Sequence, residues 1–209
     1  MPSQFRVRKI FRWLVNLIAK GLIKLRVTPN LATIIMLLFS FFSFISLVCF
    51  RNLLYFSIFV FITGIMDGCD GAIARLTNTA TKFGGFIDSF MDRFSEFFIF
   101  FGLLIFSKDQ VLWEWFDMKL IVFISFFTSI MISYTRARAE VIFKGDFDIG
   151  LMARSERLFY LFLTMLISFF YGYMQVFLFI FMWLVIATLV FRITRIYSQI
   201  NKNESIQKI

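Results

Sequence analysis

The chain has 209 residues, of which 60% are hydrophobic and 33 are phenylalanine, and its net charge is +9. A soluble domain of this length is nearer half apolar, with its apolar residues in short periodic runs, whereas here they form long blocks. This composition argues against an ordinary soluble domain. Because the basic excess lies next to apolar segments, it indicates membrane topology, and we expect no nucleic-acid partner.

The residue types restrict the chemistry that is open to the chain. It contains no histidine and only two cysteines, Cys49 and Cys69, both in apolar surroundings. No disulfide framework or zinc site is indicated, and the usual general base is absent. Acid–base chemistry must therefore fall on carboxylates. A metal that carboxylates hold is expected to be a hard cation such as Mg²⁺ or Mn²⁺.

An amphipathic segment precedes the first apolar block. Residues 4–22 carry an apolar stripe opposite basic and polar residues, which predicts a helix at the membrane interface; an amphipathic helix packed on protein is the alternative. Thr28, Pro29 and Asn30 then break the chain. We therefore assign residues 1–30 to a cytoplasmic interfacial helix.

Six apolar segments follow, each close to the roughly 20 residues that cross the hydrocarbon core as a helix. The second and third contain charged residues, and the fifth is short. We expect an all-α integral membrane protein with six transmembrane helices plus the N-terminal amphipathic helix. The helices would form one domain over residues 31–199, followed by a cytoplasmic polar tail at 200–209. The segments are 31–50, 53–76, 83–107, 119–143, 152–171 and 174–197.

Basic residues alternate between the connecting segments. The N-terminal segment, the region between the fourth and fifth apolar segments, and the tail are rich in Lys and Arg. The first turn has only Arg51, and the last turn, 171–176, has none. Basic segments stay in the cytoplasm, so the pattern predicts a multi-pass protein of the cell membrane with both termini cytoplasmic.

Four aspartates lie inside the second and third apolar segments. Asp67 and Asp70 are three residues apart, and Asp88 and Asp92 are four apart, so each pair shares one face of a helix. A short connection predicts that the two helices are antiparallel neighbours, which lets the four carboxylates meet near the cytoplasmic boundary. Clustered charges in a membrane are costly, and bound divalent cations compensate them best. Two metals clamped by shared carboxylates are a recurrent arrangement for phosphoryl transfer.

The spacing alone leaves other interpretations of these acids open. They could pair with nearby basic residues in a structural network, or they could line a cation or proton pathway. A transporter or channel would spread its acids over several spans and depths, whereas these lie at one depth in two helices. A scaffold without activity would carry the four acids only as a cost to stability. The basic residues in reach are Arg75, Lys82 and Arg93.

The same segment resembles the signature of the CDP-alcohol phosphotransferases. All eight specified positions have the family's spacing: Asp67, Asp70, Gly71, Ala74, Arg75, Gly84, Asp88 and Asp92. The resemblance implies an enzyme that transfers a phosphoalcohol group from a CDP-linked donor and releases CMP. It also implies two Mg²⁺ or Mn²⁺ ions per active site, and a homodimer that nothing in the sequence shows independently.

The resemblance further implies a role for each residue. Asp92 would bind metal and act as the catalytic general base for the acceptor hydroxyl, which needs to lose its proton only as it attacks. The metals would polarise the pyrophosphate and neutralise the charge that develops on CMP. The implied metal ligands are Asp67, Asp70, Asp88 and Asp92, and the implied donor-binding residues are Asn30, Thr33, Gly71, Arg75, Thr81 and Gly84.

Residues 133–140, Gly150 and 154–157 are similar to the branch of phosphatidylinositol phosphate and archaetidylinositol phosphate synthases. This resemblance implies transfer of a phosphatidyl-type group from CDP-diacylglycerol or CDP-archaeol to inositol phosphate, in phospholipid biosynthesis. Glycerol 3-phosphate is the alternative acceptor. Arg136 could instead pair with the glutamate four residues on. The candidates for holding the acceptor phosphate, which a guanidinium fork matches well, are Arg136, Arg154 and Arg195.

Overall fold

The computed structural model describes residues 10–142 and 150–207, and the side chains of residues 10–141 and 150–200. This part of the chain is almost entirely helical, which confirms the predicted all-α class. A small antiparallel pair, β1 (Val111–Leu112) and β2 (Phe116–Asp117), lies between the fourth and fifth helices of the order below. The helices are α2 (Arg12–Lys24), α3 (Pro29–Val48), α4 (Leu53–Leu76), α5 (Lys82–Phe106), α6 (Met118–Ile142), α7 (Arg154–Tyr171) and α8 (Met174–Gln207).

Local sequence signals set the start of the first three long helices. Thr28 caps α3 through its side-chain oxygen, and Pro29 occupies the first turn, where its missing N–H is not needed. Asn52 caps α4, its Oδ1 accepting from the backbone N–H of Leu54 at 2.9 Å. Thr81 caps α5 in the same way. Each of these helices therefore begins within two residues of the start that the sequence predicts.

Four of the described helices are long and apolar enough to cross a membrane: Pro29–Val48, Leu53–Leu76, Met118–Val141 and Met174–Ile200. Three described helices do not meet this criterion: α2 is only 13 residues long, and α5 and α7 carry charges near the acidic motif. The chain is thus an integral membrane protein. Two of the six predicted spans, 83–107 and 152–171, correspond to α5 and α7, which length and composition alone do not identify as membrane spans.

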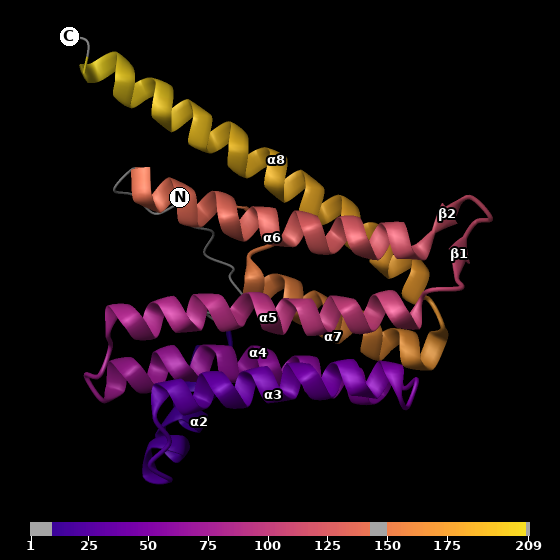
Figure 1. Cartoon of the computed structure of the whole chain (residues 1–209), viewed down its shortest axis with the longest axis horizontal. Coiled ribbons are helices and arrows are strands. Elements are labelled where there is room, and N and C mark those ends of the chain that lie inside the picture. The colour runs from indigo at the N-terminus through magenta and orange to yellow at the C-terminus, as the bar shows by residue number, and fades with distance from the viewer. Residues whose placement is uncertain (1–9, 143–149, 208–209) are drawn as a thin grey trace.

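The helices lie side by side as a bundle (Figure 1). α3 packs on both α4 and α5, α7 packs on α4, and α6 pairs with α8 and also contacts α5. α4 and α5 run antiparallel, as expected, but they make little backbone contact with each other. The acidic motif is therefore carried by two helices that a third helix holds together.

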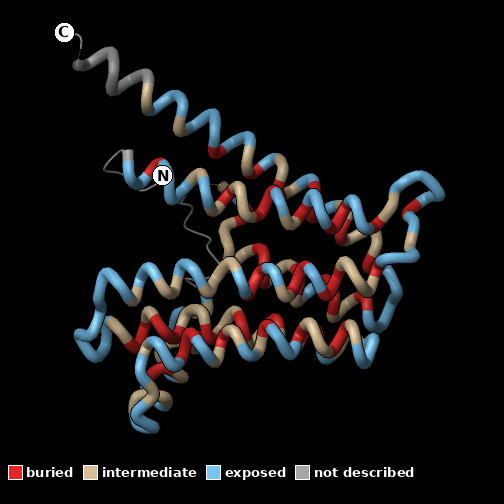
Figure 2. The backbone as a smooth tube through the Cα atoms, viewed as in Figure 1, coloured by how far each residue is buried: buried red, intermediate tan, exposed pale blue. Residues whose placement is uncertain are grey.

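Buried residues follow the inward faces of the helices, while exposed residues cover the outside and the ends (Figure 2). The main core contains large apolar side chains from each of the helices α3, α4, α5, α6, α7 and α8, such as Phe56, Leu103 and Phe181. A smaller cluster around Met36 and Ile73 joins α2, α3 and α4 beside the acidic motif. Many exposed side chains are phenylalanines, as expected for a surface that faces lipid.

The N-terminal helix α2 packs across α4 next to the acidic motif. A Cβ at Gly68 would lie 3.1 Å from Val15 Cγ2, so glycine at this position allows the close approach of the two helices. Trp13 and Leu17 of α2 remain exposed. The helix ends at Lys24, two residues beyond the predicted end at residue 22. Residues 1–9 of the segment assigned to the interface lie outside the described residues.

The segment 200–209, which we expect to be a cytoplasmic polar tail, begins within α8, and α8 continues without a break to Gln207. The reason is that 198–207 contains neither proline nor glycine to end the helix. Residues 208–209 lie outside the described residues.

Candidate active site

A cavity of about 690 Å³ lies between α2, α4, α5, α6, α7 and α8. Small-molecule pockets typically have about 300–1,000 Å³, so the cavity could hold a substrate. Its lining contrasts with the apolar exterior, because seven arginines and five acidic residues contribute to it. They are Arg12, Arg75, Arg93, Arg136, Arg154, Arg157 and Arg192, with Asp67, Asp70, Asp88, Asp92 and Glu140.

Three of the four predicted metal ligands converge in this cavity. Asp67 on α4 and Asp88 and Asp92 on successive turns of α5 each offer a carboxylate oxygen, and these oxygens all lie within 4.8 Å of one another. Asp88 Oδ1 is buried and has no hydrogen-bond partner among the described residues. A buried carboxylate oxygen without a partner is costly, and hard cations such as Mg²⁺ favour oxygen donors of this kind. The residues therefore fit a divalent metal.

Asp70, the fourth acid, is 5% exposed, and its oxygens already have partners. Its Oδ2 accepts a hydrogen bond from Thr33 Oγ1 at 3.0 Å, and its Oδ1 accepts one from the backbone N–H of Gly71 at 2.5 Å. Thr33, which we expected at the donor, is itself buried and does not line the cavity. Its hydroxyl orients the Asp70 carboxylate instead.

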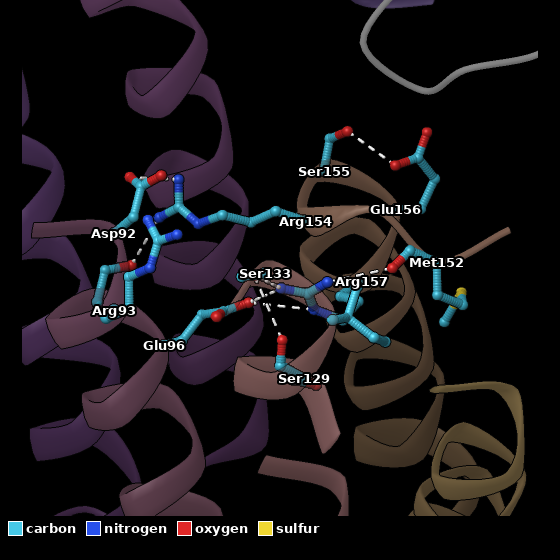
Figure 3. Close-up of polar contacts among 12 residues, drawn as sticks. Asp92, Arg93, Glu96, Ser129, Ser133, Met152, Arg154, Ser155, Glu156 and Arg157 are labelled. Atoms are coloured by element: carbon cyan, nitrogen blue, oxygen red, sulfur yellow. Dashed lines mark hydrogen bonds and ion pairs between the residues drawn. The ribbon is translucent and has the colours of Figure 1, made fainter. Parts of the chain in front are cut away.

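Arg154, which we expected at the acceptor phosphate, contacts the acidic cluster, and Figure 3 shows its guanidinium beside Asp92. Its Nη1 forms ion pairs with Asp67 and, at 2.5 Å, with Asp92 Oδ1. Its Nη2 donates to Ser95 Oγ at 3.2 Å. Arg154 is therefore a counter-cation for the carboxylates in this structure.

The other two predicted phosphate-binding arginines occupy different surroundings. Arg136 lines the cavity and its Nε donates to Glu140 Oε1 at 2.8 Å, so the alternative of a local pair is present. Arg195 is exposed and does not line the cavity; its guanidinium lies 5.3 Å from the Phe191 ring. One turn earlier, Arg192 does line the cavity. It is 2% exposed, and its Nη1 donates to the backbone carbonyl of Ile132 at 2.8 Å.

The predicted donor-binding residues fall into two groups. Gly71 and Arg75 line the cavity, and a Cβ at Gly71 would lie 3.2 Å from Arg75 Nη1. Asn30, Thr81 and Gly84 lie outside the cavity lining. These three are neighbours at the first turns of α3 and α5: a Cβ at Gly84 would lie 3.0 Å from the Thr81 hydroxyl and 3.9 Å from Asn30 Oδ1.

Sequence reasoning missed a buried ion pair, Glu96 with Arg157, one helical turn away from the acidic cluster (Figure 3). The two side chains are 2% and 1% exposed. Arg157 is noted from the sequence only within the segment 154–157 that resembles the synthase branch, and Glu96 is not singled out. The available signal was spacing: Glu96 follows Asp92 by four residues, and Arg157 follows Arg154 by three, so each lies on the same helix face as its functional neighbour.

The sequence model of the CDP-alcohol phosphatidyltransferase family matches residues 26–194, which is most of the chain. The chain belongs to this family. Archaetidylinositol phosphate synthase of Pyrococcus horikoshii is 34% identical over 151 residues, covering 72% of this chain and 76% of the relative. Phosphatidylinositol phosphate synthase of Mycobacterium tuberculosis strain H37Rv is 32% identical over 160 residues, covering 74% and 70%.

The phosphatidyltransferase also resembles solved structures. Crystal structures of the M. tuberculosis phosphatidylinositol phosphate synthase match it at 27% identity and cover 88% of this chain. The structure with CDP-DAG bound has a TM-score of 0.75 and is covered to 93%, and the complex with manganese and citrate has a TM-score of 0.76 and is covered to 88%. The predicted enzyme class is confirmed, the acidic cluster is consistent with divalent metal binding, and the transporter alternative has no support.

Proposed function

We propose that this phosphatidyltransferase moves the phosphatidyl-type group of a CDP-linked lipid, CDP-diacylglycerol or CDP-archaeol, to a hydroxyl of inositol phosphate and releases CMP. The observation that carries the proposal is that one cavity joins the acidic cluster to arginines from three helices, Arg136 of α6, Arg154 of α7 and Arg192 of α8. The two sequence relatives and the solved structures described above carry names of inositol phosphate lipid synthases.

The acidic cluster would hold two Mg²⁺ or Mn²⁺ ions through Asp67, Asp70, Asp88 and Asp92. When bound, these ions would polarise the pyrophosphate of the donor and offset the charge that develops on CMP. The residues of the chain do the rest. Asp92 takes the proton of the acceptor hydroxyl as that hydroxyl attacks, which a side chain facing the cavity can do. Thr33 supports the site by holding Asp70 in orientation.

The CDP part of the donor would lie along α4 and the first turns of α3 and α5. Gly71 leaves room beside the Arg75 guanidinium, because an added Cβ would lie 3.2 Å from Arg75 Nη1 and the guanidinium would have to shift slightly. A second group of small and polar residues lies at the first turns of α3 and α5. It consists of Asn30, Thr81 and Gly84. A lipid donor would then enter from the bilayer, with its nucleotide at the cytoplasmic end of the helices.

The acceptor phosphate would be held by Arg136, Arg154 and Arg192. A guanidinium presents a planar fork that matches phosphate oxygens, and three such groups around one cavity suit a phosphorylated alcohol. Arg195 points away from this cavity, so we give its predicted role to Arg192. The reason for the exchange is the packing of α8 on α6, which buries Arg192 and leaves Arg195 exposed.

The charges on α5 and α7 are compatible with six membrane spans. Asp92 pairs with Arg154 and Glu96 pairs with Arg157, so these charges face the inside of the bundle rather than lipid. We therefore propose that residues 31–199 form a six-span domain with both termini and the active site cytoplasmic, and that α2 lies at the interface. By family resemblance we also propose a homodimer in the lipid membrane.

The acceptor is tested by CMP release from purified protein with Mg²⁺ and CDP-diacylglycerol or CDP-archaeol. Inositol phosphate, glycerol 3-phosphate and no acceptor are compared at equal concentration. The proposal expects release that depends on inositol phosphate. Release with glycerol 3-phosphate alone would keep the metal site and exclude the proposed acceptor.

A further inference from the structure

Arg157 uses its whole guanidinium to join three parts of the fold (Figure 3). Its Nε donates to Glu96 Oε1 of α5 at 3.1 Å, and its Nη2 contacts the same oxygen. The same Nη2 reaches Ser133 Oγ of α6 at 3.3 Å, and Nη1 donates to the carbonyl of Met152 at 3.1 Å, just before α7. One side chain thus fixes α5, α6 and the entry to α7 relative to each other.

The three side chains of this network each lie one helical turn from a residue of the candidate site. Glu96 follows Asp92 by four residues on α5, Ser133 precedes Arg136 by three on α6, and Arg157 follows Arg154 by three on α7. Residues three or four apart on a helix lie above one another on one face. The network is therefore a layer directly next to the layer that holds the proposed base and two proposed phosphate-binding arginines.

Stability alone is a weak reason for a charged pair at this place. The pair is almost completely buried inside a membrane bundle. Removing two charges from water is costly, so a well-packed apolar pair of similar size would often stabilise the fold as much or more. An apolar pair, however, cannot supply directional hydrogen bonds between the helices. A guanidinium with acceptors on three segments fixes the rotation and height of each helix, because its donors form a rigid planar fork.

We propose that Glu96, Arg157 and Ser133 are positioning residues that place Asp92, Arg136 and Arg154 for reaction with the phosphorylated acceptor. This inference rests on the proposed function. In it, residues that do not react themselves align the acceptor site. The proposed donor-binding residues lie on α3, α4 and the start of α5, and none of them takes part in the hydrogen bonds of the network described above. Disturbing the network should therefore affect the acceptor more than the donor.

The decisive variant is Arg157→Lys, which keeps the charge beside Glu96 but loses the fork. The full-length protein is reconstituted with Mg²⁺, and KM is measured separately for the acceptor and for the CDP-linked lipid. We expect the acceptor KM to rise about tenfold while the donor KM stays within about twofold, because small misplacements of catalytic groups have large effects. A merely destabilised protein would lose active fraction, and so apparent kcat, without this split.

A milder pair of variants covers the case in which Arg157→Lys does not fold. Ser133→Ala removes one contact of the network, and Ser125→Ala on the same helix is the matched control because its Oγ donates to Ile121 O of its own helix. We expect about a threefold rise in acceptor KM for Ser133→Ala, the effect of one lost hydrogen bond, and none for Ser125→Ala. Unchanged acceptor KM in Ser133→Ala and in any folded Arg157→Lys protein, or equal rises in both KM values, would overturn the inference.

The proposed function fails separately, in the wild-type protein. If wild type uses glycerol 3-phosphate, the same KM comparison applies with that acceptor. If it releases no CMP with any acceptor, affinity for inorganic phosphate measured by calorimetry replaces KM, with Arg157→Lys expected to bind about tenfold more weakly. Equal phosphate affinity of wild type and variant would then refute the positioning role.

Discussion

Replacing Arg154 by glutamine should tighten the binding of divalent metal to the acidic cluster. Arg154 Nη1 touches Asp67 and Asp92, whose carboxylates we propose as metal ligands. Mg²⁺ coordinates carboxylate oxygens at about 2.0–2.1 Å, so an ion bound to both aspartates would need the space that Nη1 occupies. Metal binding must therefore displace the guanidinium from at least one carboxylate.

The size of the effect follows from the contact that is lost. A hydrogen bond to a charged group contributes about 1.5–3 kcal/mol, and the side chains of Arg154 and Asp92 are only 14% and 16% exposed, so screening by water is limited. Removing the competing guanidinium should strengthen metal binding by that amount, which corresponds to about 10- to 150-fold in Kd. Glutamine is neutral and similar in length, so it leaves little empty space.

The assay is a titration of the purified protein with Mn²⁺, in which free Mn²⁺ is measured by electron paramagnetic resonance. Arg136→Gln is the matched control, because Arg136 lines the same cavity but pairs with Glu140. We expect its Mn²⁺ affinity to change by less than about threefold, as for a partly exposed pair. Arg154→Gln protein that binds Mn²⁺ no more tightly than wild type would refute the reasoning.

Three further predictions concern single positions. Asp92→Asn should reduce transfer by about 10²- to 10⁴-fold while CDP-lipid binding is retained, and full activity in that variant would exclude the role as general base. Arg192→Gln should raise the acceptor KM at least about tenfold, whereas Arg195→Gln should leave it within about twofold; the reverse order would restore the original assignment. The free energy of unfolding of Gly150→Ala should be about 1–3 kcal/mol lower than that of Gly172→Ala, so its Tm should also be lower. Both glycines have positive φ, +121° and +78°, but only at Gly150 would a Cβ meet a neighbouring side chain, at 2.7 Å. Equal losses would show that this contact relaxes freely.

The sequence was sufficient for the features that depend on spacing along one helix. Apolar run lengths located the long helices, and capping residues such as Thr28 and Asn52 located their starts. The spacing of Asp88 and Asp92 predicted carboxylates on one helix face, and the structure brings them together with Asp67. The family followed from the same motif.

Features that depend on how helices rotate against one another could not be predicted in this way. Arg192 and Arg195 are equally plausible from charge and position, and only the packing of α8 on α6 turns Arg192 inward. Thr33 was expected to face the donor, but the contact of α3 with α4 places its hydroxyl on Asp70. The partner of Arg157 is 61 residues away, and spacing along each helix places both residues beside the site without showing that they pair.

The most direct test of the account compares inositol phosphate with free inositol as acceptor. CMP release by the wild-type protein is measured with Mg²⁺ and a CDP-linked lipid, with each acceptor over the same concentration range. The account predicts release with inositol phosphate and little with free inositol, because the arginines of the cavity would hold the phosphate. Equal release with both acceptors would contradict it, and would show that these arginines serve the structure or the donor.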